Sequence, residues 1–289
     1  MGKIELQISD KVSIEIENPT DVMEKYSQDF YTYYEHEYEI DFEDGELTDT
    51  KLREEVLEKH FKGSKNTDLS EVLVKTTLLN NFYHTRIPAN NIVPIARHIV
   101  EMKIDDRLYK KPIDVDLVNE LAYSEKTYKT KSFKTDRVDL HIKINNVYSF
   151  ASKYCSWHNP EYPIADSYSK GMLFYINKAD PFYKIDDIKM PSKASLNDYR
   201  VFCKMYKKFR ENYFKNTPDI SNKVIDTYLW KYAQNKISDL RSQGLDCTES
   251  LDGNKRISDY FKMDSSDLSS DFQKEVELLW LSWIWALLH

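Results

Sequence analysis

The first segment of the chain has alternating hydrophobic and polar positions. Isoleucine, leucine or valine occupies every second position over 4–8 and again over 12–16, and the polar residues 9–11 separate the two runs. A period of two is typical of strands that bury one face. Residues 3–17 therefore predict a short β-hairpin.

From residue 68 onward the hydrophobic residues recur every three or four positions, which is typical of amphipathic helices. Asp68 or Ser70 can cap a helix that runs to Phe82. Pro94 is expected in the first turn of the next helix, where a missing N–H does no harm. Further helices are expected at about 116–123, 148–158, from Asp166-Ser167 onward, at 197–216 and 219–241, and over the C-terminal apolar run 278–288. Segment 63–68 is predicted to be a linker and the lysine-rich segment 125–137 a basic loop, so the predicted fold class is mostly α with a small N-terminal β element.

The composition excludes several classes of protein. The chain has only 6 Gly in 289 residues and no G-x-G pair, which excludes a dinucleotide fingerprint, a P-loop and a Gly-rich kinase loop. The three cysteines lie far apart, so neither a zinc knuckle nor a disulfide framework is expected, and a reducing, cytoplasmic compartment is indicated. The N-terminus is too polar for a signal peptide. The longest apolar run has 11 residues, whereas a spanning helix needs about 20, so no membrane contact is expected.

Charge divides the chain into three blocks. Residues 1–60 hold 6 basic and 18 acidic residues, residues 61–240 hold 30 and 21, and residues 241–289 hold 5 and 9. The corresponding organisation is an acidic N-terminal extension with the β-hairpin (1–65), a helical body (66–242) and an acidic C-terminal tail ending in an apolar helix (243–289). Two interpretations fit: the basic body contacts nucleic acid, or the acidic ends fold back onto it. A protein partner for the acidic N-terminal arm is a further expectation.

The segment 145–173 carries the candidate chemistry. On a helix that starts near Tyr148, the residues Phe150, Ala151, Tyr154 and Cys155 share one face and are expected in the core, whereas Ser149, Lys153, Ser156 and Trp157 share the other. A lysine on a serine-lined, aromatic-flanked surface is unusual. Asp166 follows a proline-bounded loop at the start of the next helix, where its carboxylate is aimed over the preceding helix.

This arrangement resembles the helix-hairpin-helix DNA glycosylase superfamily, and within it the 8-oxoguanine DNA glycosylase-fold proteins. Lys153 matches the family's nucleophilic lysine, and Asp166 in the sequence Pro163-Ile164-Ala165-Asp166 matches its aspartate. The resemblance covers roughly residues 70–240. It implies a helix-hairpin-helix glycosylase-like body. Asn145-Asn146 stands where the family hairpin carries glycines, and 13 positions separate Lys153 from Asp166, fewer than is typical of the family.

The resemblance implies a metal-independent and cofactor-free DNA glycosylase, with abasic-site lyase activity, that acts in repair or in defence against foreign DNA. Duplex DNA with a flipped nucleotide is the implied partner. Lys153 attacks the sugar C1′ and Asp166 stabilises the developing positive charge and helps to deprotonate the amine. The base-pocket candidates are Tyr148, Ser149, Trp157 and His158. The DNA-binding candidates are Asn145, Asn146, Lys126, Lys129, Lys131, Lys134, Arg137, Lys204, Lys207, Lys208 and Arg210.

Each candidate also has a structural interpretation. Lys153 can be a solvated surface lysine, Asp166 a helix N-cap, and His158 a helix C-terminal residue that interacts with the dipole. Two other functions stay open. A non-catalytic nucleic-acid-binding or protein-binding protein on the same fold is the first. A metal-dependent nuclease is the second, because Asp166 and Asp187-Ile188-Lys189 loosely echo a Pro-Asp … Asp-x-Lys core.

Overall fold

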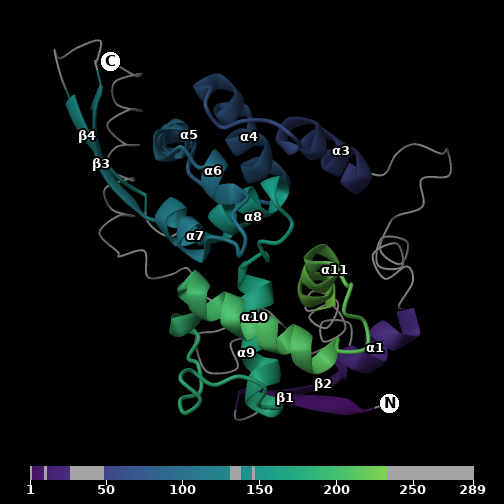
Figure 1. Cartoon of the computed structure of the whole chain (residues 1–289). Helices are drawn as coiled ribbons and strands as arrows, with labels where there is room; N and C mark the ends of the chain where they lie inside the picture. Colours follow the sequence, from purple (N-terminus) through teal and green to yellow (C-terminus); the bar gives the residue numbers. More distant parts are fainter. Residues whose placement is uncertain (1, 10–11, 27–48, 131–137, 145–146, 233–289) are drawn as a thin grey trace, which may run out of the picture.

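The computed structural model describes residues 2–9, 12–26, 49–130, 138–144 and 147–232 (Figure 1). These residues are mostly helical, which confirms the expected fold class. The α-helices are α1 (Pro19–Tyr26), α3 (Asp49–Phe61), α4 (Leu69–Phe82), α5 (Ala89–Met102), α6 (Asp105–Leu108), α7 (Val115–Ala122), α8 (Tyr148–His158), α9 (Ser167–Ala179), α10 (Tyr199–Tyr213) and α11 (Asn222–Thr227). A 3-10 turn, η1 (Ala194–Asn197), precedes α10, and a π-helical turn, η2 (Tyr228–Tyr232), follows α11. The acidic segment 27–48 and the apolar run 278–288 lie outside the described residues.

The predicted N-terminal hairpin is present. Strands β1 (Lys3–Ser9) and β2 (Val12–Glu17) pair antiparallel, with Leu6 opposite Ile14. Leu6 and Ile14 are buried and Glu5 is exposed, so the alternation places one face against the protein. This face contacts α9, and the Glu17 amide donates to the Tyr232 hydroxyl at 2.8 Å. The described part of the acidic N-terminus thus packs onto the body.

The prediction of a basic loop at 125–137 is wrong for residues 125–130, which belong to a strand. Strand β3 (Ser124–Thr130) pairs antiparallel with β4 (Val138–Ile144) and forms a second two-stranded ribbon. The signal was the alternation of valine, leucine and isoleucine at every second position of 138–144, which predicts a strand. The ribbon lies between α7 and α8, and Figure 1 shows it projecting from the body. It precedes Asn145-Asn146, the position of the hairpin in the resemblance, which lies outside the described residues.

Helix boundaries follow the capping chemistry. Asp68 caps α4 and accepts from the amides of Ser70 and Glu71, as predicted. The following helix α5 begins at Ala89, so Pro94 lies in its second turn rather than in its first. The helix predicted at 219–241 begins at Asn222 as α11, and after Thr227 its geometry changes to that of the η2 turn, which reaches the last described residue, Tyr232.

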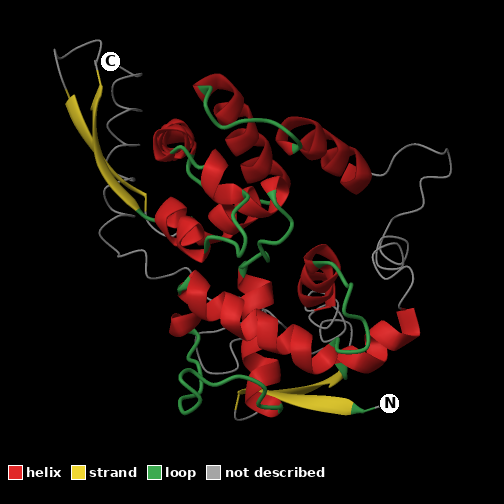
Figure 2. Ribbon diagram, in the orientation of Figure 1, coloured by secondary structure: helices red, strands yellow, loops and turns green. Residues whose placement is uncertain are grey.

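The helices form two groups (Figures 1 and 2). Helices α3–α8 lie on one side, and α9, α10, α11, α1 and the β1–β2 hairpin lie on the other. The segment from α8 to α9 passes from one group to the other, and an ion pair of 2.8 Å between Lys223 of α11 and Glu54 of α3 also connects them. Within the described part of the chain, no helix has the length and apolar character needed to cross a bilayer.

Candidate functional site

Lys153 of α8 and Asp166 at the start of α9 lie together at this junction. The ammonium nitrogen Nζ of Lys153 is 3.2 Å from Oδ2 of Asp166 and donates to Oγ of Ser149 at 2.9 Å. Both charged side chains are buried, with exposed fractions of 6% and 10%. Both charged groups lose hydration on burial, and the attraction between them together with their hydrogen bonds must offset that loss. The predicted lysine and aspartate are therefore in direct contact.

The expected exposure of Lys153 is wrong. Helix α8 is buried around most of its circumference, since α7 and α4 pack against it, and Lys153 is only 5% exposed as a whole residue. A helix enclosed on several sides has no solvent face, so an amphipathic interpretation of its sequence misplaces the polar residues. Burial makes Lys153 dependent on partners within the protein.

Local hydrogen bonds hold the turn that presents Asp166. The carboxylate caps α9, with Oδ1 accepting from the Ser169 amide at 2.9 Å and Oδ2 directed at Lys153. The Ala165 amide donates to Oγ of Ser152 at 3.1 Å. The Ile164 amide donates to Oδ2 of Asp226, on α11, at 3.0 Å. Asp166 is thus an N-cap, and the cap geometry leaves its second oxygen for the lysine.

Tyr83, at the end of α4, covers the lysine. Its ring centre is 5.5 Å from Nζ of Lys153, and its hydroxyl accepts from Nε1 of Trp157 at 3.2 Å. A cation over an aromatic face at this distance is attracted by the ring quadrupole. Burial raises the pKa of the Tyr83 phenol. Trp157, a predicted base-pocket residue, therefore reaches the site through Tyr83.

His158 is not part of this group. Its Nε2 donates to Oδ1 of Asn66 at 3.1 Å, and the same oxygen accepts from the Lys75 ammonium and the Tyr154 hydroxyl. Burial, and then the charge of Lys75, lower the pKa of His158 to about 3, so the ring is neutral. The placement of His158 in a base pocket beside Lys153 is therefore wrong, because the ring serves a separate buried network that includes Asp105.

The basic candidates fall into three sets. Lys126 and Lys129 lie on strand β3, whereas Lys131, Lys134, Arg137, Asn145 and Asn146 lie outside the described residues. On α10, Lys207 and Lys208 form surface ion pairs with Glu211 at 3.8 and 2.9 Å, and Arg210 donates to the Pro218 carbonyl at 2.8 Å. Lys204 is exposed on the same helix.

The segment proposed for a nuclease core has a different geometry. Asp186 and Asp187 both have left-handed backbones, with φ of 49° and 59°, and form a tight turn closed by the Ile185–Lys189 bridge. Ile188 is 84% exposed. An Asp-x-Lys core requires a buried strand, and this turn is not one. Among the described residues no group of three His, Cys, Asp or Glu side chains is arranged to hold a metal.

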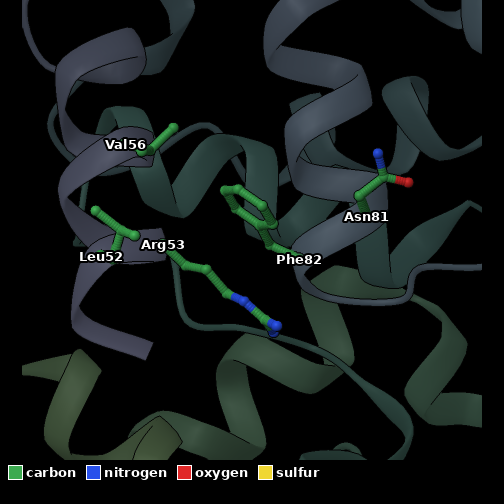
Figure 3. Close-up of a pocket in the computed structure, with 5 residues that line it drawn as sticks. All are labelled: Leu52, Arg53, Val56, Asn81 and Phe82. Carbon is green, nitrogen blue, oxygen red and sulfur yellow. The ribbon is translucent and has the colours of Figure 1, made fainter. Parts of the chain in front are cut away.

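A cavity of about 370 Å³ lies between α3 and α4 (Figure 3). Its lining residues are Leu52, Arg53, Val56, Asn81 and Phe82. The Arg53 guanidinium is 5.8 Å from the centre of the Phe82 ring, and Phe82 directly precedes Tyr83 in the chain. The cavity is open to solvent and combines apolar side chains with one guanidinium and one amide.

Three residues near the candidate site were missed. Asp226 is 60 positions from Asp166 and gave no signal in the sequence. Tyr83 ends a helix that was predicted, but nothing in the pattern directs its ring at Lys153. Lys170 could have been found, since it follows Asp166 by four positions and therefore lies on the same face of α9.

The chain is similar to known proteins over part of its length. The family model HI_0787_N, described as an N-terminal domain, matches residues 32–162. An uncharacterized protein of Haemophilus influenzae is 34% identical over 167 residues, which are 57% of this chain and 67% of that protein. No solved structure matches the chain.

Proposed function

The chain belongs to the HI_0787_N family, and we propose that it is a DNA glycosylase with abasic-site lyase activity that excises a damaged or modified base from duplex DNA. The observation that carries this proposal is the buried contact of 3.2 Å between Nζ of Lys153 and Oδ2 of Asp166. A lysine nucleophile must lose its proton before it attacks, and a carboxylate at hydrogen-bond distance can take that proton. Repair and defence against foreign DNA are both compatible roles.

In the proposed reaction the target nucleotide leaves the duplex and enters the junction between the two groups of helices. Asp166 accepts a proton from Lys153, and the lone pair of Nζ attacks the sugar C1′. The glycosidic bond breaks and its electron pair leaves with the base. The sugar ring then opens to give a Schiff base between Nζ and C1′. Loss of a C2′ proton expels the 3′ phosphate and cleaves the strand.

Two neighbouring groups support the same proposal. Tyr83 and Trp157 are linked by a hydrogen bond of 3.2 Å beside the lysine, and aromatic rings are the surfaces on which unstacked bases pack. Ser149 Oγ, at 2.9 Å from Nζ, is a further hydrogen-bond partner of the ammonium. In this proposal the base stacks on Tyr83 after the ring moves off the lysine.

Borohydride trapping tests the function. Duplexes that carry oxidised, alkylated, deaminated or abasic sites are incubated with the protein in EDTA, and covalent adducts are then counted. We expect an adduct on abasic DNA and on at least one base lesion. Lys153→Gln should lose the adduct on the base lesion. Asp166→Asn should slow its formation by about 100-fold, although asparagine still caps α9. Lys178→Gln, at an exposed lysine of α9 that is not a candidate site residue, is the matched control.

The absence of any adduct with the unmodified protein, on abasic DNA as well, would contradict the proposal. A non-catalytic DNA-binding or protein-binding role would then replace it. Cleavage that occurs with Mg²⁺ and stops in EDTA would instead favour the metal-dependent nuclease.

A further inference from the structure

Lys170 is a second buried lysine at the junction. It lies in α9, one helical turn after Asp166, and only 6% of it is exposed. Its Nζ donates to Oδ1 of Asn197 in η1 at 2.7 Å and lies 4.8 Å from the centre of the Tyr148 ring. The proposed excision step makes no use of this amine.

The partners of Lys170 differ from those of Lys153. Lys153 has a carboxylate within ion-pair distance, whereas the described residues give Lys170 a neutral amide and an aromatic face. The phenol oxygen of Tyr148 is buried and has no hydrogen-bond partner within the described part of the chain. The charged groups that act on Lys170 are Asp166 on its own helix and Lys153 on α8.

This environment favours the neutral amine. Burial, against the attraction of Asp166 and with the repulsion of Lys153, lowers the pKa of Lys170 to about 8. About one amine in ten is then uncharged at pH 7, compared with fewer than about one in a thousand for an ordinary lysine. A lysine that is desolvated and lies near another cation is the usual form of a nucleophilic amine.

We propose that Lys170 is a second reactive amine of this site, which forms a Schiff base with an aldehyde. The lone pair of Nζ makes the C–N bond, the carbonyl oxygen takes up protons and leaves as water, and the C=N bond remains. If the proposed function holds, the aldehyde is C1′ of the opened sugar at an abasic site; the reactivity of the amine itself does not rest on that function.

Reductive methylation of the whole protein tests the proposal. Formaldehyde with cyanoborohydride at pH 7 converts each Schiff base to a methylated amine, and peptide mapping by mass spectrometry gives the rate at every lysine. We expect Lys170 to react about tenfold faster than the exposed Lys204. Lys75 is a second buried lysine whose pKa is also lowered to about 8, and its ammonium donates to the Lys65 carbonyl and to Asn66. Since the same fraction of its amine is neutral, it should react at a rate similar to that of Lys170.

Asn197→Asp provides a second readout without altering the lysine. The new carboxylate would pair with the ammonium, and the reaction of Lys170 at pH 7 should become about tenfold slower while that of Lys75 is unchanged. The proposal is overturned if Lys170 reacts no faster than Lys204, or if Asn197→Asp has no effect on Lys170.

Abasic DNA separates this inference from the proposed function. In Lys153→Gln, a residual borohydride adduct on abasic DNA should map to Lys170 and disappear in the double variant with Lys170→Gln. A protein that gives no DNA adduct at all but shows rapid methylation of Lys170 would refute the glycosylase and leave the reactive amine in place. DNA adducts found only on Lys153, with slow methylation of Lys170, would support the glycosylase and refute the reactive amine at Lys170.

Discussion

Asp226 is the carboxyl group that connects α11 to the candidate site. It is 6% exposed, and its Oδ2 accepts from the Ile164 amide at 3.0 Å, two residues before Asp166. Burial raises the pKa of this carboxyl, and the nearby charge of Asp166 adds to the effect. A protonated Asp226 can hold the turn without placing a second negative charge beside Asp166.

Replacing Asp226 with asparagine tests this account. The pKa of Asp226 is higher in the folded protein than in the unfolded chain. At a pH above the ordinary carboxyl pKa the folded protein therefore binds more protons, and its stability falls as the pH rises. The asparagine side chain would be neutral at every pH, so the free energy of unfolding of Asp226→Asn, relative to the unmodified protein, should increase from pH 5 to pH 8. Urea denaturation at both pH values measures this. A difference that does not change with pH would show that the carboxyl is ionised throughout.

His158 produces the opposite pH dependence. The pKa of His158 is about 3 in the folded protein, below the ordinary value of 6.5. Between these two pH values the unfolded chain binds a proton that the folded protein does not bind, so stability falls as the pH falls. Between pH 7 and pH 5 the loss should be roughly 2 kcal/mol. His158→Gln, which can still donate to Asn66, should remove this part of the acid dependence in urea denaturation. An unchanged slope would mean that the ring does not stay neutral.

At the scale of elements, Asn66 connects the helices that surround the site. It lies in the linker between α3 and α4, and its Oδ1 accepts from Lys75 of α4 and from Tyr154 and His158 of α8. Its amide groups donate to Asp105 at the start of α6. One short side chain thus fixes α4, α6 and α8 relative to one another, and with α8 it fixes Lys153.

Asn66→Ala should destabilise the fold strongly. The substitution leaves three buried donors without their common acceptor, and each unsatisfied group costs about 1–3 kcal/mol. We expect a loss of about 3 kcal/mol in the free energy of unfolding, measured by urea denaturation. Asn90→Ala, at an exposed position of α5, is the control and should change stability by less than about 0.5 kcal/mol. Equal effects of the two substitutions would contradict the role of the network.

The whole molecule depends on its N-terminal segments. Leu6, Ile14 and Ile16 of the first hairpin and Leu57 and Phe61 of α3 are all buried in the core. The acidic block 1–60 thus contains both surface charge and core residues. The described part of this block therefore packs onto the body through its apolar side chains, and Glu54 also pairs with Lys223.

Deletion of residues 1–61 should therefore abolish folding rather than release a DNA-binding body. Removing buried leucine, isoleucine and phenylalanine side chains costs about 2–5 kcal/mol for each, which exceeds the stability of an ordinary domain in sum. The expected result is loss of the cooperative thermal transition by circular dichroism. A truncated protein that melts cooperatively and binds duplex DNA more tightly would establish autoinhibition by the arm.

The period-two and period-3.6 patterns are local properties of the sequence, so many of the strands and helices could be predicted from them. The hairpin at 3–17, the helix capped by Asp68 and the helix capped by Asp166 follow from residues that lie close together in the chain. The ribbon at 124–144 was predictable by the same rule, but the lysines of its first strand obscured the alternation in its second.

The mostly helical class, the principal caps and the hypothesis that Lys153 pairs with Asp166 could all be predicted from the amino-acid sequence, because each rests on neighbours within a few turns or on a short motif. The burial of Lys153, the position of Tyr83 over it, the hydrogen bond of His158 to Asn66 and that of Asp226 to the turn before Asp166 are evident only in the folded protein. These facts depend on which distant helices enclose α8, and no local pattern encodes the neighbours that the folded chain brings to a buried helix.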